Sequence, residues 1–357
     1  MPPLPESRPL LADCARRHAL ASLFRAVAAA CALVVLGACG GGGGAAPEPP
    51  PPSPPPPAPT PAATGPIAAQ LSVPTPVGYD ADRLAAFNRL NEIRLAAGLG
   101  MLAQSVAQDQ AAQAHAAWIV ANDSFTHDET AGTTGFTGVH WWDRDEALGY
   151  VPVGGWEVMA QSVRGAQGVD VLVNTVYHRA GMLAFEPVDV GIGWSGLAAA
   201  DISSPLVMDI TRPGTDAVRG LGQLAQGSAA GVVVWPTEGA RDVPLRLGHE
   251  VPDPVPTQDV LSLGLPASIT VSADKTLAAV SFVLSEEVSG RTVPARALMS
   301  GDDPNGLLPG SFTALIPLAA LAPNSRYRVV FAGSTTSFPS GAVSQVNRTW
   351  TFTTASQ

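Results

Sequence analysis

The thiol of Cys39 is the first side chain whose type and surroundings point to a defined reaction. It closes the run Val-Leu-Gly-Ala-Cys at 35–39, directly after an apolar stretch that begins at Ala26, and several arginines precede that stretch. A basic start, about eleven apolar residues and small residues before a cleavage point form an export signal, whereas a membrane span would need roughly 20 apolar residues. The pattern predicts that residues 1–38 are a lipoprotein signal peptide and that Cys39 becomes lipidated.

Lipid on Cys39 would tie the protein to a membrane and place the rest of the chain outside the cytoplasm. Each buried methylene adds about 0.8 kcal/mol of membrane affinity, so two or three acyl chains anchor a protein permanently. Cys14 and Cys31 fall inside the predicted signal, so the remaining chain has no disulfide and no thiol nucleophile. Gly40 follows the cysteine, and resemblance to lipoproteins of bacteria with two membranes favours the outer membrane over the inner one.

Other polar side chains carry weaker local signals. His140 stands beside Trp141 and Trp142, and an imidazole with two indoles can line a cleft and stack on sugar faces. Ser195 lacks the Gly-x-Ser-x-Gly turn of a hydrolase nucleophile. His115 lies in an alanine-rich segment, where we expect a satisfied, half-buried histidine rather than a ligand.

Acidic residues predominate, and the chain has a net charge of −10. This balance argues against nucleic acid and against anionic polymers as partners. Asp123, Asp128 and Glu129 lie close together, but they lack the Asp-x-Asp-x-Asp-Gly pattern of a calcium loop. We therefore expect these three carboxylates to lie in a solvated loop.

The elements that must position these groups lie in a first domain, residues 80–213. Asp80 or Asp82 can cap a helix that ends near Gly98. Apolar periodicity predicts three more helices and three strands. The expected helices span about 104–122, 143–149 and 169–179, and the expected strands 157–163, 188–194 and 206–210. The last two strands should pair antiparallel, and helices on both sides of a small sheet are the simplest packing.

Two segments flank this domain. Residues 39–79 are rich in glycine and then proline and predict a flexible start followed by a stiff spacer, a tether of about 3.1 Å per residue in its proline part. Residues 231–357 hold short β-branched runs separated by Pro, Gly, Asn and Asp, which predicts an all-β sandwich. The expected strands are 231–235, 267–271, 279–284, 311–316, 327–331 and 349–353. The opening Pro236 to Pro244 and the closing Trp350 to Thr354 resemble bacterial immunoglobulin-like (Ig-like) domains of the SbsA type.

The order of several short motifs in the first domain resembles the CAP superfamily, in its bacterial SCP-like branch. These motifs are Leu-Asn-Glu-Ile-Arg at 90–94, Ala-His-Ala at 114–116, Phe-Thr-His at 125–127, Gly-Tyr at 149–150, Glu157, His-Arg-Ala at 178–180 and Val-Gly-Ile-Gly at 190–193. The resemblance implies an α+β fold, an α-β-α sandwich followed by the all-β Ig-like sandwich. It also implies a cleft with His127, Glu157 and His178. The chain departs from the bacterial pattern, because Trp-Glu-Val-Met replaces Gly-Glu-Asn-Ile and Thr-Val-Tyr precedes the histidine in place of Ser-Pro-Gly.

Two imidazoles and a carboxylate could do one of three things. They could bind Zn²⁺ with an open position for water, although the spacing of His127, Glu157 and His178 matches no tight ligand motif. They could act in a metal-dependent hydrolase, with Glu157 as a ligand or general base. They could also form a polar network or binding cleft, walled by Trp141, Trp142 and Trp156. We expect a binding module of the cell envelope, with a small apolar molecule, a glycan or a protein as ligand, and keep the hydrolase as the alternative.

Overall fold

The computed structural model describes residues 69–196, 204–213 and 231–357. Every described residue belongs to one compact unit, Ala63–Gln357. The predicted signal peptide, the lipidation site Cys39 and most of the predicted tether therefore lie outside the described residues. Among the helices that are described, none is long and apolar enough to cross a membrane.

A four-stranded sheet is the centre of the first region, with strand order β1-β3-β4-β2. Its strands are β1 (Ala103–Gln104), β2 (Pro152–Ala160), β3 (Asp189–Trp194) and β4 (Leu206–Pro213). β1 runs parallel to β3, and β4 is antiparallel to both β3 and β2. The antiparallel pairing predicted for β3 and β4 is confirmed.

The two long helices of this region begin where the sequence places caps. Asp80 accepts the backbone N–H of Arg83 and begins α2 (Ala81–Ala96), and Ser105 caps α3 (Val106–Asn122) in the same way. Asp123 ends α3 in the left-handed conformation.

The three shorter helices are α4 (Trp141–Ala147), α5 (Gly165–Val173) and α6 (Tyr177–Met182). The single helix expected at about 169–179 is thus two helices. A short turn at 174–176 separates them.

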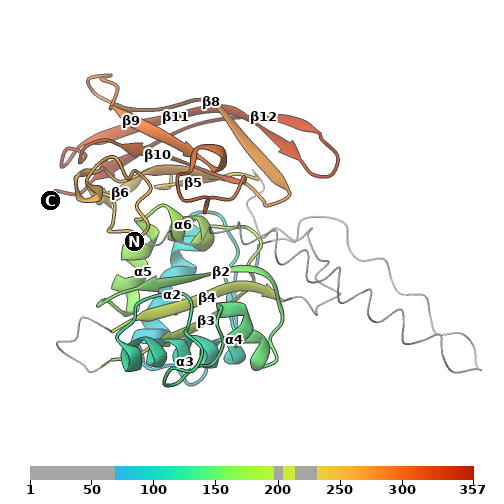
Figure 1. The fold of residues 1–357 in the computed structure, drawn as a ribbon. Helices are drawn as coiled ribbons and strands as arrows, with labels where there is room; N and C mark the ends of the chain where they lie inside the picture. The colour runs from blue at the N-terminus through green and yellow to red at the C-terminus, as the bar shows by residue number, and fades with distance from the viewer. Residues whose placement is uncertain (1–68, 197–203, 214–230) are drawn as a thin grey trace, which may run out of the picture. The chain divides into compact units, whose positions relative to one another are not determined.

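Helices cover both faces of the sheet, as Figure 1 shows. Val158, Met208 and Ile210 point toward α2, α5 and α6, where they join one apolar core. Met159 and Val207, on the opposite face, join a smaller core with residues of α3. Because side chains alternate along a strand, Glu157 and Asp209 also face the α3 side.

The helix α3 lies directly on strand β3. A Cβ atom at Gly191 would come within 2.3 Å of Gln108, and one at Gly193 within 2.2 Å of the Gln113 backbone nitrogen. Only glycine permits so close an approach. The alternation in Val-Gly-Ile-Gly therefore gives β3 one apolar face toward the main core and one bare face toward α3.

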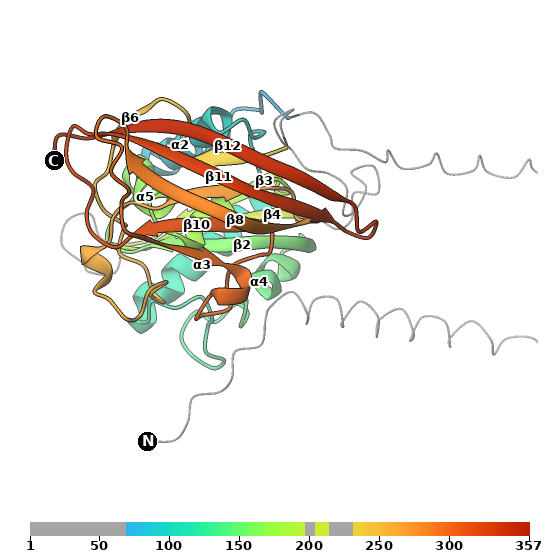
Figure 2. The same cartoon turned by 90° about the horizontal axis from the view of Figure 1, so that it is seen from above.

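Two further four-stranded sheets form the second region, with orders β5-β7-β10-β9 and β6-β12-β11-β8. Figure 2 shows β12, β11 and β8 side by side. The strands are β5 (Val233–Trp235), β6 (Ala240–Val243), β7 (Ala267–Thr270), β8 (Lys275–Glu286), β9 (Ala295–Met299), β10 (Phe312–Pro317), β11 (Arg326–Ser337) and β12 (Val343–Thr354), with two short 3-10 helices at Val260–Ser262 and Ser300–Asp302. Residues from both sheets share one apolar core, which is the arrangement of a sandwich. The sequence prediction missed β6 and β9 and made β8, β11 and β12 too short.

Glu250 connects the two regions. Its buried carboxylate accepts the backbone N–H groups of Val176 at 2.8 Å and Tyr177 at 2.7 Å. Arg179, also buried, donates to the carbonyl of Pro266 at 2.7 Å. A third apolar cluster contains residues of α6 and of the second region together. The second region is therefore packed on the first through charge-assisted hydrogen bonds and apolar contacts.

Candidate functional site

His127, Glu157 and Arg144 form the chemical centre of the first region. The Nδ1 atom of His127 lies 2.8 Å from Oε1 of Glu157, and Nη2 of Arg144 donates to Oε2 of the same carboxylate at 2.5 Å. The side chains of Glu157 and Arg144 are each 1% exposed, whereas that of His127 is 50% exposed. The imidazole is thus the accessible end of a buried ion pair.

The charge of Glu157 decides the tautomer of His127. Burial alone would raise the pKa of Glu157, but the Arg144 guanidinium and the contacts with His127 and His115 outweigh it and lower this pKa to about 2. An ionised carboxylate can only accept hydrogen bonds, so Nδ1 of His127 must donate. In the neutral imidazole, Nε2 is then the acceptor and the ring atom that remains for a ligand.

A second histidine–carboxylate pair lies behind the first. Nδ1 of His115 lies 3.0 Å from Oε1 of Glu129, and its Nε2 donates to the carbonyl of Thr126 at 3.0 Å. Both side chains are fully buried, and burial lowers the pKa of His115. Glu129 also accepts the backbone N–H of Thr137 at 2.6 Å. Instead of the predicted solvated position, Glu129 is buried and organises the loop from inside, because its carboxylate accepts the Thr137 backbone N–H and lies beside the His115 ring.

Two more carboxyl groups are buried near Glu157. Asp209 is its cross-strand partner on β4, and Asp145 lies on α4, next to Arg144 in the chain. Burial, with the nearby charge of Glu157, raises the pKa of Asp209 well above its usual range. Burial also raises the pKa of Asp145 to about 7. Because these two pKa values are raised, the carboxyl groups of Asp209 and Asp145 hold their protons more readily than usual. The network therefore carries less negative charge beside the single guanidinium of Arg144.

The structure does not bring His178 to this site. It lies in α6, where Nδ1 is 3.1 Å from Oε1 of Glu250 and 3.0 Å from the hydroxyl of Thr175. The predicted grouping of His127, Glu157 and His178 is therefore corrected. His115 is the second histidine at Glu157, with Nε2 3.9 Å from Oε1. The Ala-His-Ala motif carries the sequence signal for His115, which is a satisfied histidine as expected but is fully buried rather than half-buried.

The side chains at Glu157 do not fit a zinc site. Both oxygens of Glu157 are engaged by Arg144 and His127, and both nitrogens of His115 are engaged as well. Within the described ranges, no three His, Cys, Asp or Glu side chains are placed to hold a metal ion.

The three tryptophans predicted as cleft walls have different positions. Trp156 packs against the main apolar core and would contact a Cβ at Gly181 of α6 at 2.6 Å, so it faces away from Glu157. Strand alternation explains this correction, because neighbouring residues point to opposite faces. Trp141 and Trp142 are partly buried at the start of α4 and meet edge to face at 5.4 Å. His140 stacks on Trp142 at 4.4 Å, so these aromatic rings lie on the helix that supplies Arg144.

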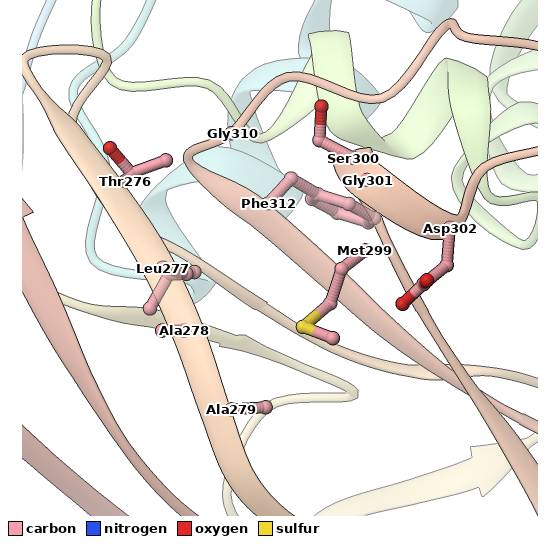
Figure 3. A pocket seen from close by; sticks show the side chains of 10 residues that line it. All are labelled: Thr276, Leu277, Ala278, Ala279, Met299, Ser300, Gly301, Asp302, Gly310 and Phe312. Atoms are coloured by element: carbon pink, nitrogen blue, oxygen red, sulfur yellow. The ribbon is translucent and has the colours of Figure 1, made fainter.

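Two cavities of the described residues lie away from His127. One, of about 370 Å³, opens in the second region between β8 and the turn after β9, with Leu277, Met299 and Phe312 among its apolar lining (Figure 3). The other, of about 590 Å³, lies beside α3 and is lined by residues that include Gln110 and Gln113. Neither is lined by Glu157. The site at His127 is a half-exposed side chain on a buried network.

The match to a known protein family falls on the first region of the chain. Residues 87–199 match the model of the cysteine-rich secretory protein family, CAP. This match supports a CAP domain, also called an SCP domain, in the first region of the chain. A search of curated proteins gave no match.

Solved structures that resemble the chain do so weakly. An extracellular protein containing an SCP domain from Bacillus anthracis is 19% identical with a TM-score of 0.31, and the match covers 37% of this chain and 40% of that one. An outer surface protein from Borrelia burgdorferi is 16% identical with a TM-score of 0.30, over 36% of this chain and 89% of that one. The chain thus spans less than half of the first of these proteins.

Proposed function

We propose that this chain is a lipid-anchored, extracytoplasmic CAP-domain protein that works as a binding module of the cell envelope. In this proposal Cys39 carries the lipid, residues 39–79 are the tether, and His127 contacts the ligand. The observation that supports it best is a half-exposed imidazole held by a fully buried carboxylate and guanidinium. A side chain fixed in this way presents Nε2 in one orientation, which lowers the entropy lost on binding.

The chemistry of Nε2 favours a ligand with a hydrogen-bond donor. A neutral imidazole that donates through Nδ1 accepts through Nε2. A glycan hydroxyl supplies such a donor, whereas a purely apolar molecule does not. We therefore propose an envelope glycan as the first ligand to test, with an apolar molecule and a protein loop as the other outcomes.

Binding is best measured on the unit Ala63–Gln357 by calorimetry with soluble envelope glycan fragments. His127→Ala should weaken binding at least about tenfold, because the loss of one well-oriented hydrogen bond costs on the order of 1.4 kcal/mol. His249→Ala is the matched control, since His249 is an exposed histidine of the second region. Equal binding by wild type and His127→Ala would refute the role of His127.

The anchor has a separate test. Cells that express the full chain should incorporate labelled fatty acid into the wild-type protein and not into Cys39→Ser. The variant should leave the membrane fraction, since the lipid is the proposed anchor. Membrane association that persists in Cys39→Ser would contradict the anchor and leave the binding role untouched.

No contact in the site favours the metal-dependent hydrolase, because both oxygens of Glu157, Nδ1 of His127 and both nitrogens of His115 already have partners. Thermal unfolding with EDTA and then with increasing Zn²⁺ checks this directly. A saturable rise in Tm that is absent from His127→Ala would restore the metal hypothesis.

A further inference from the structure

A closed ring of contacts fixes His127 at both its backbone and its side chain. Nη1 of Arg144 donates to the carbonyl oxygen of His127 at 3.2 Å. Nη2 of the same guanidinium donates to Oε2 of Glu157 at 2.5 Å, and Oε1 of Glu157 accepts from Nδ1 of His127 at 2.8 Å. The ring therefore starts and ends on one residue and passes through one guanidinium and one carboxylate.

The same guanidinium holds the far end of the loop that begins at His127. Nη1 also donates to the carbonyls of Gly138 at 3.4 Å and Val139 at 3.2 Å. The backbone N–H of Glu129 donates to the Val139 carbonyl at 2.9 Å and closes the loop from inside. Both ends of the segment 127–139 thus meet at Arg144.

Arg144 can do this because its own position is fixed. Its backbone N–H donates to the carbonyl of His140 in the first turn of α4. Asp143 accepts the backbone N–H of His140 at 3.1 Å, which fixes the start of the helix. The side chain is 1% exposed and has no free volume around it at Gly138, where a Cβ would lie 3.0 Å from Cγ of Arg144.

The hydrogen-bond acceptors of Arg144 differ from those of two other buried arginines. Arg94 donates to the carbonyls of Gly100, Met182 and Ala184, and Arg179 to those of Val173 and Pro266. No contact described for either joins it to a carboxylate at hydrogen-bond distance. Arg144 alone among the three combines carbonyl acceptors with a carboxylate, and a planar fork is needed to reach both at once.

We propose that Arg144 is the positioning residue of this site: through its fork it sets the rotamer and tautomer of His127 and holds the loop 127–139 in the ligand-ready conformation. The proposal rests on the proposed binding role of His127, but its direct test needs no ligand. Arg144 acts on the ligand only through His127 and the loop.

The test is NMR of the imidazole nitrogens of His127 together with amide hydrogen exchange of residues 128–138. In the wild type the neutral ring should be the Nδ1–H tautomer. Arg144→Lys keeps the charge, but without the fork the Glu157 carboxylate is no longer held against Nδ1 of His127, so we expect a mixture of tautomers and at least about tenfold faster exchange in the loop. Arg94→Lys is the control, since it removes a buried fork that does not touch the site and should leave both readouts unchanged.

A second variant covers the case in which Arg144→Lys does not fold. Gly138→Ala keeps every charge and introduces a methyl group 3.0 Å from Cγ and the backbone nitrogen of Arg144. It should disturb the guanidinium and change the same two readouts in the same direction. An unchanged tautomer and unchanged exchange in a folded Arg144→Lys or Gly138→Ala would overturn the proposal.

The positioning role of Arg144 and the binding role of His127 can fail separately, and the two failures give different results. If Arg144→Lys alters the His127 tautomer and the loop, and no glycan fragment binds the wild type, the positioning role stands and the proposed ligand is wrong. If a glycan binds through His127 and Arg144→Lys binds it equally well with an unaltered tautomer, the binding role stands and the positioning role is wrong.

Discussion

The two regions of this chain differ in what they bury besides apolar side chains. The buried network around Glu157 in the first region contains four carboxyl groups, a guanidinium and an imidazole, those of Glu129, Asp145, Glu157, Asp209, Arg144 and His115. The shared core of the two sheets in the second region is instead apolar, with Phe331, Trp350 and Phe352 among its largest members. Burying charge is costly and burying apolar area is favourable. The first region bears this cost around Glu157, and the exposed end of that buried network is the half-exposed imidazole of His127.

The comparison predicts different tolerance to substitutions of similar size. An apolar core accepts a residue of similar volume because no directed contact is lost. A buried ion pair does not tolerate the replacement of one partner by an uncharged residue of similar volume, because the other partner stays charged and uncompensated. The four changes below test this difference, from the largest expected effect to the smallest.

Glu157→Gln should have the largest effect. It preserves shape and removes the charge that Arg144 faces at 2.5 Å, so the free energy of unfolding should fall by about 3–5 kcal/mol. Urea denaturation measures the loss. The control is Glu287→Gln, whose partners Arg326 and Arg328 are 58% and 48% exposed, and which should cost about 0–1 kcal/mol. Similar losses in the two variants would show that the buried network contributes no more than a surface pair.

Glu250→Gln tests the junction between the two regions. Its carboxylate accepts from the backbone of Val176 and Tyr177 and lies beside His178. Replacing charge-assisted hydrogen bonds by neutral ones should lower the free energy of unfolding by about 1.5–3 kcal/mol. The denaturation curve is expected to broaden or split if the two regions unfold separately once this contact is weakened. A curve identical to that of the wild type would mean that the apolar cluster at the junction is sufficient.

Leu284→Met is the counterpart in the apolar core. Leu284 is 1% exposed on β8, and a swap of similar volume should cost less than about 1.5 kcal/mol. Urea denaturation under the same conditions gives the loss in the free energy of unfolding, which is then compared with the loss in Glu157→Gln. A loss as large as that of Glu157→Gln would remove the contrast between the two interiors.

Asp209→Asn should have the smallest effect and the most informative pH dependence. The raised pKa of Asp209 means that the folded protein keeps a proton that the unfolded chain releases near pH 4. Its contribution to stability is therefore present at low pH and is lost as pH rises. Asparagine has no proton to lose, so the stability of the variant relative to wild type should rise between pH 5 and pH 8.

Melting temperatures of Asp209→Asn and wild type at both pH values give this difference. Asp170→Asn is a surface control, because its partner Arg89 is partly exposed and its own side chain is 42% exposed. A difference between Asp209→Asn and wild type that stays constant or shrinks with rising pH would show that Asp209 is ionised in the folded protein.

Much of the fold could be predicted because its signals are local. Asp80 as a helix cap, the helix over most of 104–122 and the pairing of β3 with β4 follow from capping residues, glycine positions and apolar alternation. The break between α5 and α6 was not predictable in this way. It places His178 and the α6 N–H groups against Glu250, some 70 residues further along the chain.

The candidate site was predictable only in part. His127 and Glu157 could be proposed from their motifs, and the structure joins them. Arg144 and Glu129 gave no comparable signal, since an arginine in a short helix and a glutamate in a loop are ordinarily solvated. Trp156 was assigned to the wrong face because the register of β2 was not known at the level of one residue.

The sequence by itself determined the types of element, the mixed first region, the β-rich second region and the pair of residues at the exposed end of the site, because periodicity and capping act over a few residues. Only the tertiary structure decided which charges became buried together. Glu157 meets Arg144 across 13 positions and Asp209 across the sheet. Such contacts depend on strand register and helix placement, and the free energy of a buried charge depends on every partner that those placements bring within reach.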